Sequence, residues 1–145
     1  MNFDVEVSKD GNSLYFVDGR FDQIGGPYEA DIVLAEKRNG IFQRSSNQSI
    51  LANINTSVLE YAACISSNQL ELYFTRVDPP LTASSTPQIY VATRNSTAEP
   101  FSQPYNIDTI SGFVEAPTIS PDGQIIYYHK KENERFTLYM VRKQR

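Results

Sequence analysis

Residues 119–128 read ISPDGQIIYY, and two other stretches of the chain have the same pattern. Residues 7–16 read VSKDGNSLYF, and residues 65–74 read ISSNQLELYF. Each version has an apolar residue, a serine, a polar turn and then an apolar, aromatic run. A unit that recurs along the chain at this scale is the signature of a repeat architecture.

The spacing of the repeats indicates the kind of unit. Val7 and Ile65 are 58 positions apart, and Ile65 and Ile119 are 54 positions apart. These periods lie slightly above the ~40–50 residues of a β-propeller blade. We place the excess in the loops.

Each unit also has a second half, an apolar segment that ends in charged or polar residues, at 30–37, 87–94 and 136–143. One unit therefore holds four short extended segments, which in the second unit cover about 61–66, 70–76, 87–94 and 101–108. The second segment of each unit is almost continuously apolar, as in a strand that is buried on both faces. The fourth is more polar, as an outer edge strand should be.

The turn between the first two segments follows ordinary turn chemistry. In the third unit, Pro121 sets φ for a type I turn, Asp122 follows, and Gly123 accepts positive φ. The second unit has no glycine there, so we expect Asn68 to take the left-handed conformation, at a cost of about 1 kcal/mol relative to glycine.

A helix competes with a strand over residues 58–65, which have good helix propensity. The matching segment of the third unit contains Pro117, which a helix interior rejects. We therefore predict a loop and a strand in both segments.

Several spaced motifs together resemble the TolB-type, WD-like β-propeller repeat. They are INT at 54–56, EAPTISPDG at 115–123, IYY at 126–128, QIYV at 88–91 and DIV at 31–33. The resemblance covers essentially the whole chain. It implies an all-β fold, a partial β-propeller of three blades, each a four-stranded antiparallel sheet, with the last blade lacking its outer strand. The expected organisation is one domain, 1–145, with blades at about 3–53, 54–108 and 109–145.

Three blades are fewer than the roughly four to eight that close a propeller ring. Two copies could complete a six-bladed ring, the chain could be part of a longer propeller, or the arc could be stable when open. An open arc exposes two apolar blade faces, and apolar patches of that size indicate association. We expect a homodimer or larger ring if the chain is the entire gene product.

Candidate ligand-binding residues gather on one face of the expected arc, where two sets of connections surround the central channel. They are Asp18, Arg20, Asp22, Glu60, Tyr61, Arg76, Glu115 and His129. Carboxylates, arginines and a tyrosine suit a polar ligand, such as a peptide segment or a saccharide. The alternative is that these are solvated loop charges, with Glu60 and Glu115 paired to arginines between blades.

Composition limits the remaining possibilities. The 145 residues carry a net charge of −4, which argues against a nucleic-acid partner, and no apolar run approaches a membrane span. No catalytic, metal-binding or cofactor-binding motif is recognisable: we expect no metal and no cofactor, and read Cys64 as a small buried residue. The N-terminus lacks signal-peptide features, which predicts a cytoplasmic protein if the chain is complete and a periplasmic or extracellular one if it is part of a longer chain.

Three functions fit these observations. The one that we favour is a non-catalytic binding or scaffold module for proteins or polar ligands, which self-associates to complete a ring. A carbohydrate-active hydrolase or lyase would need two carboxyl groups about 5–10 Å apart in one pocket. The third is an accessory propeller of a peptidase.

Overall fold

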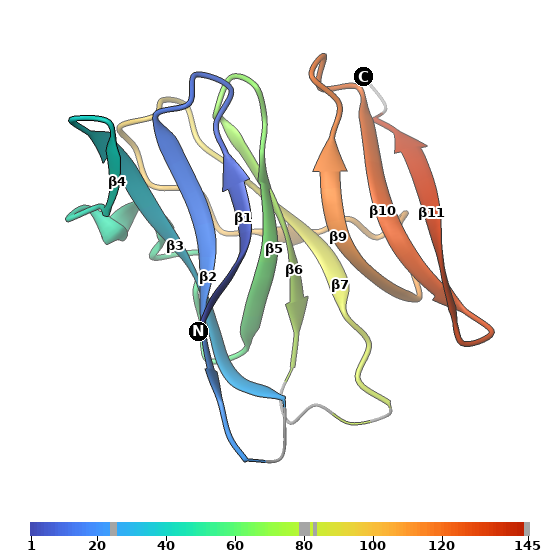
Figure 1. The fold of residues 1–145 in the computed structure, drawn as a ribbon. Coiled ribbons are helices and arrows are strands. Elements are labelled where there is room, and N and C mark those ends of the chain that lie inside the picture. Colours follow the sequence, from blue (N-terminus) through green and yellow to red (C-terminus); the bar gives the residue numbers. More distant parts are fainter. Residues whose placement is uncertain (24–25, 79–81, 83, 144–145) are drawn as a thin grey trace.

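The computed structural model describes residues 1–23, 26–78, 82 and 84–143. Three antiparallel sheets stand side by side in chain order (Figure 1). The first sheet contains β1 (Asn2–Val7), β2 (Ser13–Phe21), β3 (Pro27–Arg38) and β4 (Ile41–Arg44). The second contains β5 (Leu59–Ile65), β6 (Glu71–Val77), β7 (Gln88–Thr93) and β8 (Tyr105–Asn106). The third contains β9 (Phe113–Ile119), β10 (Ile125–Glu132) and β11 (Arg135–Arg142).

The sheets are the blades of a partial propeller, as predicted. Each runs in sequence order, and β1, β5 and β9 are the inner strands, since β5 contacts both β1 and β9. Within the described residues the third blade has three strands, as expected for a blade without its outer strand. Residues 59–65 form a strand, so the helical alternative for this segment was wrong.

The outer strand of the second blade differs from its prediction. Residues 101–108 were expected to be extended, but the regular strand is limited to Tyr105–Asn106, with further backbone bonds to β7 from Ser102 N and Ile107 N. Phe101 instead leaves the sheet and packs fully buried between the first two blades. Burial of the aromatic side chain of Phe101 stabilises this departure from a regular edge strand.

The three repeat turns have one hydrogen-bond plan. In the first turn Ser8 Oγ donates to Asp10 Oδ1 (2.5 Å) and accepts from Ser13 N (2.9 Å). Matching bonds join Ser66 with Asn68 and Ser120 with Asp122. These contacts lower the pKa of Asp10 and Asp122, chiefly through the serine hydroxyl. The serine and acidic residues of the motif therefore stabilise turns.

The left-handed residue of the second turn is Gln69, with φ 60°, and not Asn68 as expected. Gly11 and Gly123 hold the same place in the other turns, each with φ 71°. Asn68 is fixed instead in the aspartate position, where its Oδ1 accepts from Ser66 Oγ and Leu70 N. These two hydrogen bonds hold Asn68 in that position, so the next residue, Gln69, adopts the strained left-handed conformation.

A β-bulge interrupts each inner strand at the same repeat position. Asp4, Ala62 and Ala116 have φ of 50°, 51° and 53°, and the pairing registers shift beside them. Ala62 N–H donates to the Asp4 carboxylate, and Ala116 N–H donates to Thr75 Oγ1 (2.9 Å). Each of these two bulges is therefore held by the preceding blade, which offsets the left-handed strain.

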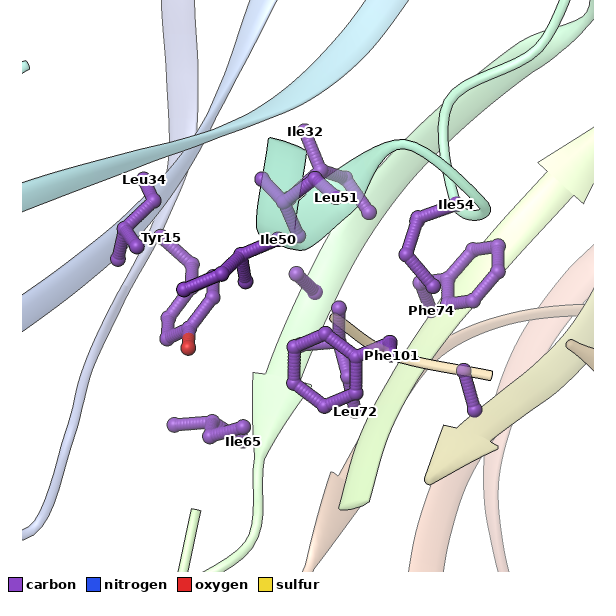
Figure 2. Close-up of a cluster of buried hydrophobic side chains, with 12 residues drawn as sticks. Tyr15, Ile32, Leu34, Ile50, Leu51, Ile54, Ile65, Leu72, Phe74 and Phe101 are labelled. Carbon is purple, nitrogen blue, oxygen red and sulfur yellow. The ribbon is translucent and has the colours of Figure 1, made fainter. Parts of the chain in front are cut away.

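The core lies between the blades, and each blade has two distinct faces. We define the forward face of a blade as the face that packs on the next blade. In the first blade this face carries Tyr15, Ile32 and Leu34. We call the rear face the one that packs on the preceding blade, as Leu72 and Phe74 do in the second. Figure 2 shows these side chains in the first interblade cluster.

The second interblade cluster repeats the first. The forward face of the second blade supplies Tyr73, Ile89 and Val91, and the rear face of the third supplies Ile126 and Tyr128. In the first two blades the second strand is buried on both faces, as predicted. In β10 the buried residues alternate with exposed ones, because no other blade in the described part of the chain covers the forward face of the third blade.

Candidate functional site

Most of the candidate residues lie in strands rather than in the loops where the sequence placed them. The sheet between β2 and β3 extends further than expected, with Asp18 opposite Asp31 and Arg20 opposite Glu29. The oppositely charged pair Arg20–Glu29 (3.3 Å) helps to continue this ladder. Asp22 follows β2 and is exposed.

Asp18 and Arg20 project from the rear face of the first blade, away from the other candidates. Arg44 Nη2 lies 2.5 Å from Asp18 Oδ2, and its guanidinium lies over the Phe16 ring, 5.8 Å from the centroid. The pair forms a charged cover over an apolar patch of this face, which consists of Leu14, Phe16, Val33, Ala35 and Phe42.

Glu60 and Arg76 form an internal ion pair. They are cross-strand neighbours on β5 and β6, and Arg76 Nε donates to Glu60 Oε1 at 2.9 Å. Glu60 has no exposed surface, and Thr56 Oγ1 donates to the same oxygen at 2.7 Å. Burial raises the pKa of Glu60, against the opposing effect of the Thr56 and Arg76 contacts.

Arg76 completes this internal cluster. Its Nη2 donates to Ile54 O, and its guanidinium lies over the rings of Phe74 and Tyr90, 4.7 Å from the Tyr90 centroid. The carboxylate of Glu60 is therefore enclosed by protein groups, and its described contacts are those of a structural ion pair.

Tyr61 and Glu115 do meet, across the boundary between the second and third blades. Tyr61 Oη donates to Glu115 Oε2 at 3.0 Å. Burial, followed by the negative charge of Glu115, raises the pKa of Tyr61, so its hydroxyl remains a donor. His129 is paired with Glu115 in the ladder of β9 and β10, and its ring contacts Phe136 edge-on at 6.4 Å.

Cys64 is buried in β5, and its thiol contacts both neighbouring blades. Its Sγ donates to Glu6 Oε1 and accepts from Ile119 N, each at 3.4 Å. Burial raises the pKa of the thiol to about 12. Cys64 therefore remains a protonated link between the blades.

An apolar cleft of about 510 Å³ lies beside Tyr61. It lies where the inner strands begin and the second strands end. Its aromatic walls are Phe3, Phe21, Tyr61 and Phe113, and Phe3 meets Phe21 edge-on at 5.9 Å. Asp4 supplies a carboxylate whose pKa burial raises.

Only Tyr61 of the candidate set lines this cleft. The sequence analysis did not include the other walls, because an apolar residue in a strand or loop carries no local sign that it lines a cleft. The repeat alignment held a usable signal, since Phe3 and Tyr61 are separated by one repeat, as are Leu59 and Phe113. Matching positions on adjacent inner strands converge at this cleft.

No metal site or membrane helix is found in the part of the chain that the structure describes. Over residues 1–23, 26–78, 82 and 84–143, no group of three or more His, Cys, Asp or Glu side chains could hold a metal ion. None of the helices described is long and apolar enough to cross a membrane.

Comparison with known proteins identifies the fold. No protein-family model matches the sequence, and no curated protein matches it. Among solved structures, TolB from Acinetobacter baumannii is similar, with a TM-score of 0.63 and 17% sequence identity over 98% of this chain. The match spans 30% of the length of that TolB chain. The resemblance of the repeats is thus confirmed for the fold: the chain is folded as a TolB-like arc of three β-propeller blades.

Proposed function

We propose that this chain is a non-catalytic interaction module that binds a second copy of itself head to tail. The free forward face of the third blade would pack on the free rear face of the first blade of the other copy. One observation carries the proposal. Tyr127, Leu138 and Met140 are 42%, 73% and 66% exposed, yet they occupy the forward-face positions that are buried in the other two blades.

Each of these three residues has a counterpart at the same repeat position in the first and second blades. Tyr127 matches Tyr15 and Tyr73, which the next blade covers almost completely. On β11, Leu138 lies opposite His129 and Met140 lies opposite Tyr127. Their counterparts in the second blade are Ile89 and Val91. Large apolar side chains are expected at an interface between blades and not on a face that stays in water.

The rear face of the first blade supplies the matching surface. Leu14 and Phe16 hold the places of Leu72 and Phe74, which pack on a forward face. Leu14 is partly exposed, and Phe16 lies beneath the Arg44 guanidinium. An incoming forward face could bury Leu14 once Arg44 moves aside.

Charge also favours this pairing. Near one end of the rear face, Asp31 has its pKa raised by burial and then by the negative charges of Glu29 and Asp18. The matching end of the free forward face carries Lys131 and His129. Opposite charges at the edge of an interface speed association and fix its register.

A contact of this kind joins two different surfaces and is therefore heterologous, so it closes only when the rotation per copy permits. Two arcs of three blades would give six blades, within the range of closed propellers. Closure would place the apolar cleft at the central channel. We propose that the cleft then receives an apolar side chain of a peptide, since its walls are mainly apolar.

Complementation between two blocked variants tests the assembly. In one variant Leu138→Glu and Met140→Glu block the forward face, and in the other Leu14→Glu blocks the rear face. Each variant alone should remain monomeric in sedimentation velocity. The mixture should form a heterodimer, because one intact face of each kind remains.

The outcomes separate the possible contacts. A mixture that stays monomeric, or a rear-face variant that still dimerises, would overturn the head-to-tail arrangement. If Leu14→Glu unfolds the first blade, the charge reversal Asp18→Lys with Asp31→Lys replaces it as the rear-face variant. Its association should weaken at low salt, whereas a contact that does not use this face would leave it unchanged.

A further inference from the structure

The two interblade clusters are built from matching residues. Tyr15, Leu34, Leu72 and Ala92 in the first correspond to Tyr73, Val91, Ile126 and Val141 in the second. Each pair occupies the same position in the strand registers. The second cluster can therefore be compared with the first, residue by residue.

Phe101 breaks this correspondence, since the second cluster has no counterpart to it among the described residues. In the first cluster Phe101 is 0% exposed and points into the core between the blades (Figure 2). Arg94 lies over its ring, 4.3 Å from the centroid. Its backbone N–H donates to Ile50 O at 3.1 Å, and its carbonyl accepts from Asn53 Nδ2 at 2.8 Å. Ile50 and Leu51 of the 3₁₀ helix η1 (Gln48–Leu51) complete the same region of the first cluster.

A cleft of about 390 Å³ lies at the matching place between the second and third blades. Tyr73, Val91, Ile126 and Val141 line it, and these are the counterparts of residues that share the first cluster with Phe101. Lys143 also lines the cleft and holds the place of Arg94, with its Nζ 2.7 Å from Glu71 Oε1. The cleft thus offers an apolar wall and a cation where Phe101 has both in the preceding blade pair.

Among residues 1–23, 26–78, 82 and 84–143, no strand pairs with the outer edge of β11 beside this cleft. In the second blade, Tyr90 and Val91 pair with β8. Tyr139 and Met140 are their counterparts, and in the described residues β11 is the last strand of its sheet. A strand added antiparallel to β11 would satisfy these backbone groups, as in β-augmentation.

We propose that the β11 edge and this cleft bind an extended peptide segment of a partner protein in trans. The segment would carry an aromatic residue about four positions before the residues that pair with β11, as Phe101 precedes Tyr105. A second copy is a poor donor, because its own Phe101 is buried within its first two blades. This site is distinct from the head-to-tail contact and does not depend on it.

Fluorescence anisotropy with a labelled synthetic peptide tests the proposal. The probe is the chain's own segment, residues 95–108, added to the intact protein below the concentration at which it self-associates. Saturable binding is expected, and Phe101→Ala in the peptide should weaken it roughly tenfold or more, since one aromatic side chain loses its burial. Val141→Arg in the protein should abolish binding, whereas Val5→Arg, at an exposed position of β1, should leave it unchanged.

Photo-cross-linking locates the bound peptide even if Val141→Arg destabilises the third blade. A photoreactive phenylalanine at the Phe101 position should label residues 125–143. The proposal is overturned by an absence of saturable binding, by equal affinity of the Phe101→Ala peptide, or by labelling confined to the first two blades around Tyr15 and Arg94.

Discussion

Tyr61 and Glu115 occupy the same position in consecutive repeats, and Tyr61 Oη donates a hydrogen bond of 3.0 Å to Glu115 Oε2 across a blade boundary. Their inner strands lie side by side, so a single repeat position brings the two side chains together. The tyrosine is held as a donor by burial and by the carboxylate that it contacts. This contact links the second and third blades directly.

Tyr61→Phe should therefore loosen that boundary. Hydrogen bonds to charged groups contribute about 1.5–3 kcal/mol, and we expect a loss near the lower end because the pair is only partly buried. Urea unfolding measures the change. Tyr105→Phe is the matched control at an exposed tyrosine and should alter stability by less than about 0.5 kcal/mol. Equal effects of the two substitutions would show that the Tyr61–Glu115 bond is not stabilising.

Arg76→Met should be far more costly, because it leaves the Glu60 carboxylate buried without its cation. Breaking a buried pair in this way costs about 3–5 kcal/mol. The exposed pair Arg38–Glu36 provides the control, and Arg38→Met should cost less than about 1 kcal/mol. The double variant Glu60→Gln with Arg76→Met should regain part of the loss.

The stability deficit of Arg76→Met should shrink as the pH is lowered from 7 towards 5. Burial already raises the pKa of Glu60 above the unfolded value, and loss of Arg76 would raise it further. A carboxyl with a raised folded pKa binds its proton more tightly when folded, so stability falls as pH rises through that pKa. Urea unfolding at both pH values checks this, and a deficit that grows on acidification would contradict the assignment.

Gln69→Gly should stabilise the chain, because Gln69 has φ 60° where the other repeats have glycine. Relief of the left-handed strain is worth about 1 kcal/mol, less the greater freedom of glycine in the unfolded chain. The substitution also removes the exposed bond from Gln69 Nε2 to Asp10 Oδ2. Gln124→Gly, one position after the left-handed residue of the third turn, should destabilise by a few tenths of a kcal/mol or more. Thermal unfolding should give opposite signs for the two variants.

The apolar cleft at the start of the inner strands should bind an uncharged, environment-sensitive dye. Phe21→Gln at its rim should weaken binding several-fold by removing one aromatic wall. Ile41→Gln changes an apolar residue that is 65% exposed elsewhere on the first blade, and should have no effect. The assay is best made with the forward-face variant Leu138→Glu with Met140→Glu, so that dye bound to the exposed forward face does not contribute. Unchanged binding by Phe21→Gln would exclude the cleft as the dye site.

Repeat periodicity predicted the sheets well, because alternating turns and apolar runs are local properties. The burial of Glu60 was not predictable in the same way. It depends on the register that puts Arg76 opposite Glu60, and on Thr56 folding back onto the carboxylate. The same holds for Asp18 and Arg20, which seemed to be loop charges until the ladder of β2 and β3 was seen to continue through them.

The cleft was missed for a related reason. Phe3 and Phe113 are apolar residues in strands, and sequence alone does not distinguish a wall of an open cleft from a core residue. Only the convergence of inner strands reveals the difference. The second turn is a further example. The hydrogen bonds of Asn68 within the turn leave Gln69 as the residue in the left-handed conformation.

The mass of the protein in solution tests the central claim most directly. Sedimentation equilibrium over a range of concentrations should show a monomer of 16.4 kDa that converts reversibly to a species of twice that mass. The variant Leu138→Glu with Met140→Glu should remain at 16.4 kDa throughout. A wild-type chain that stays monomeric and natively folded at every concentration, with the forward face of its third blade in water, would contradict the account.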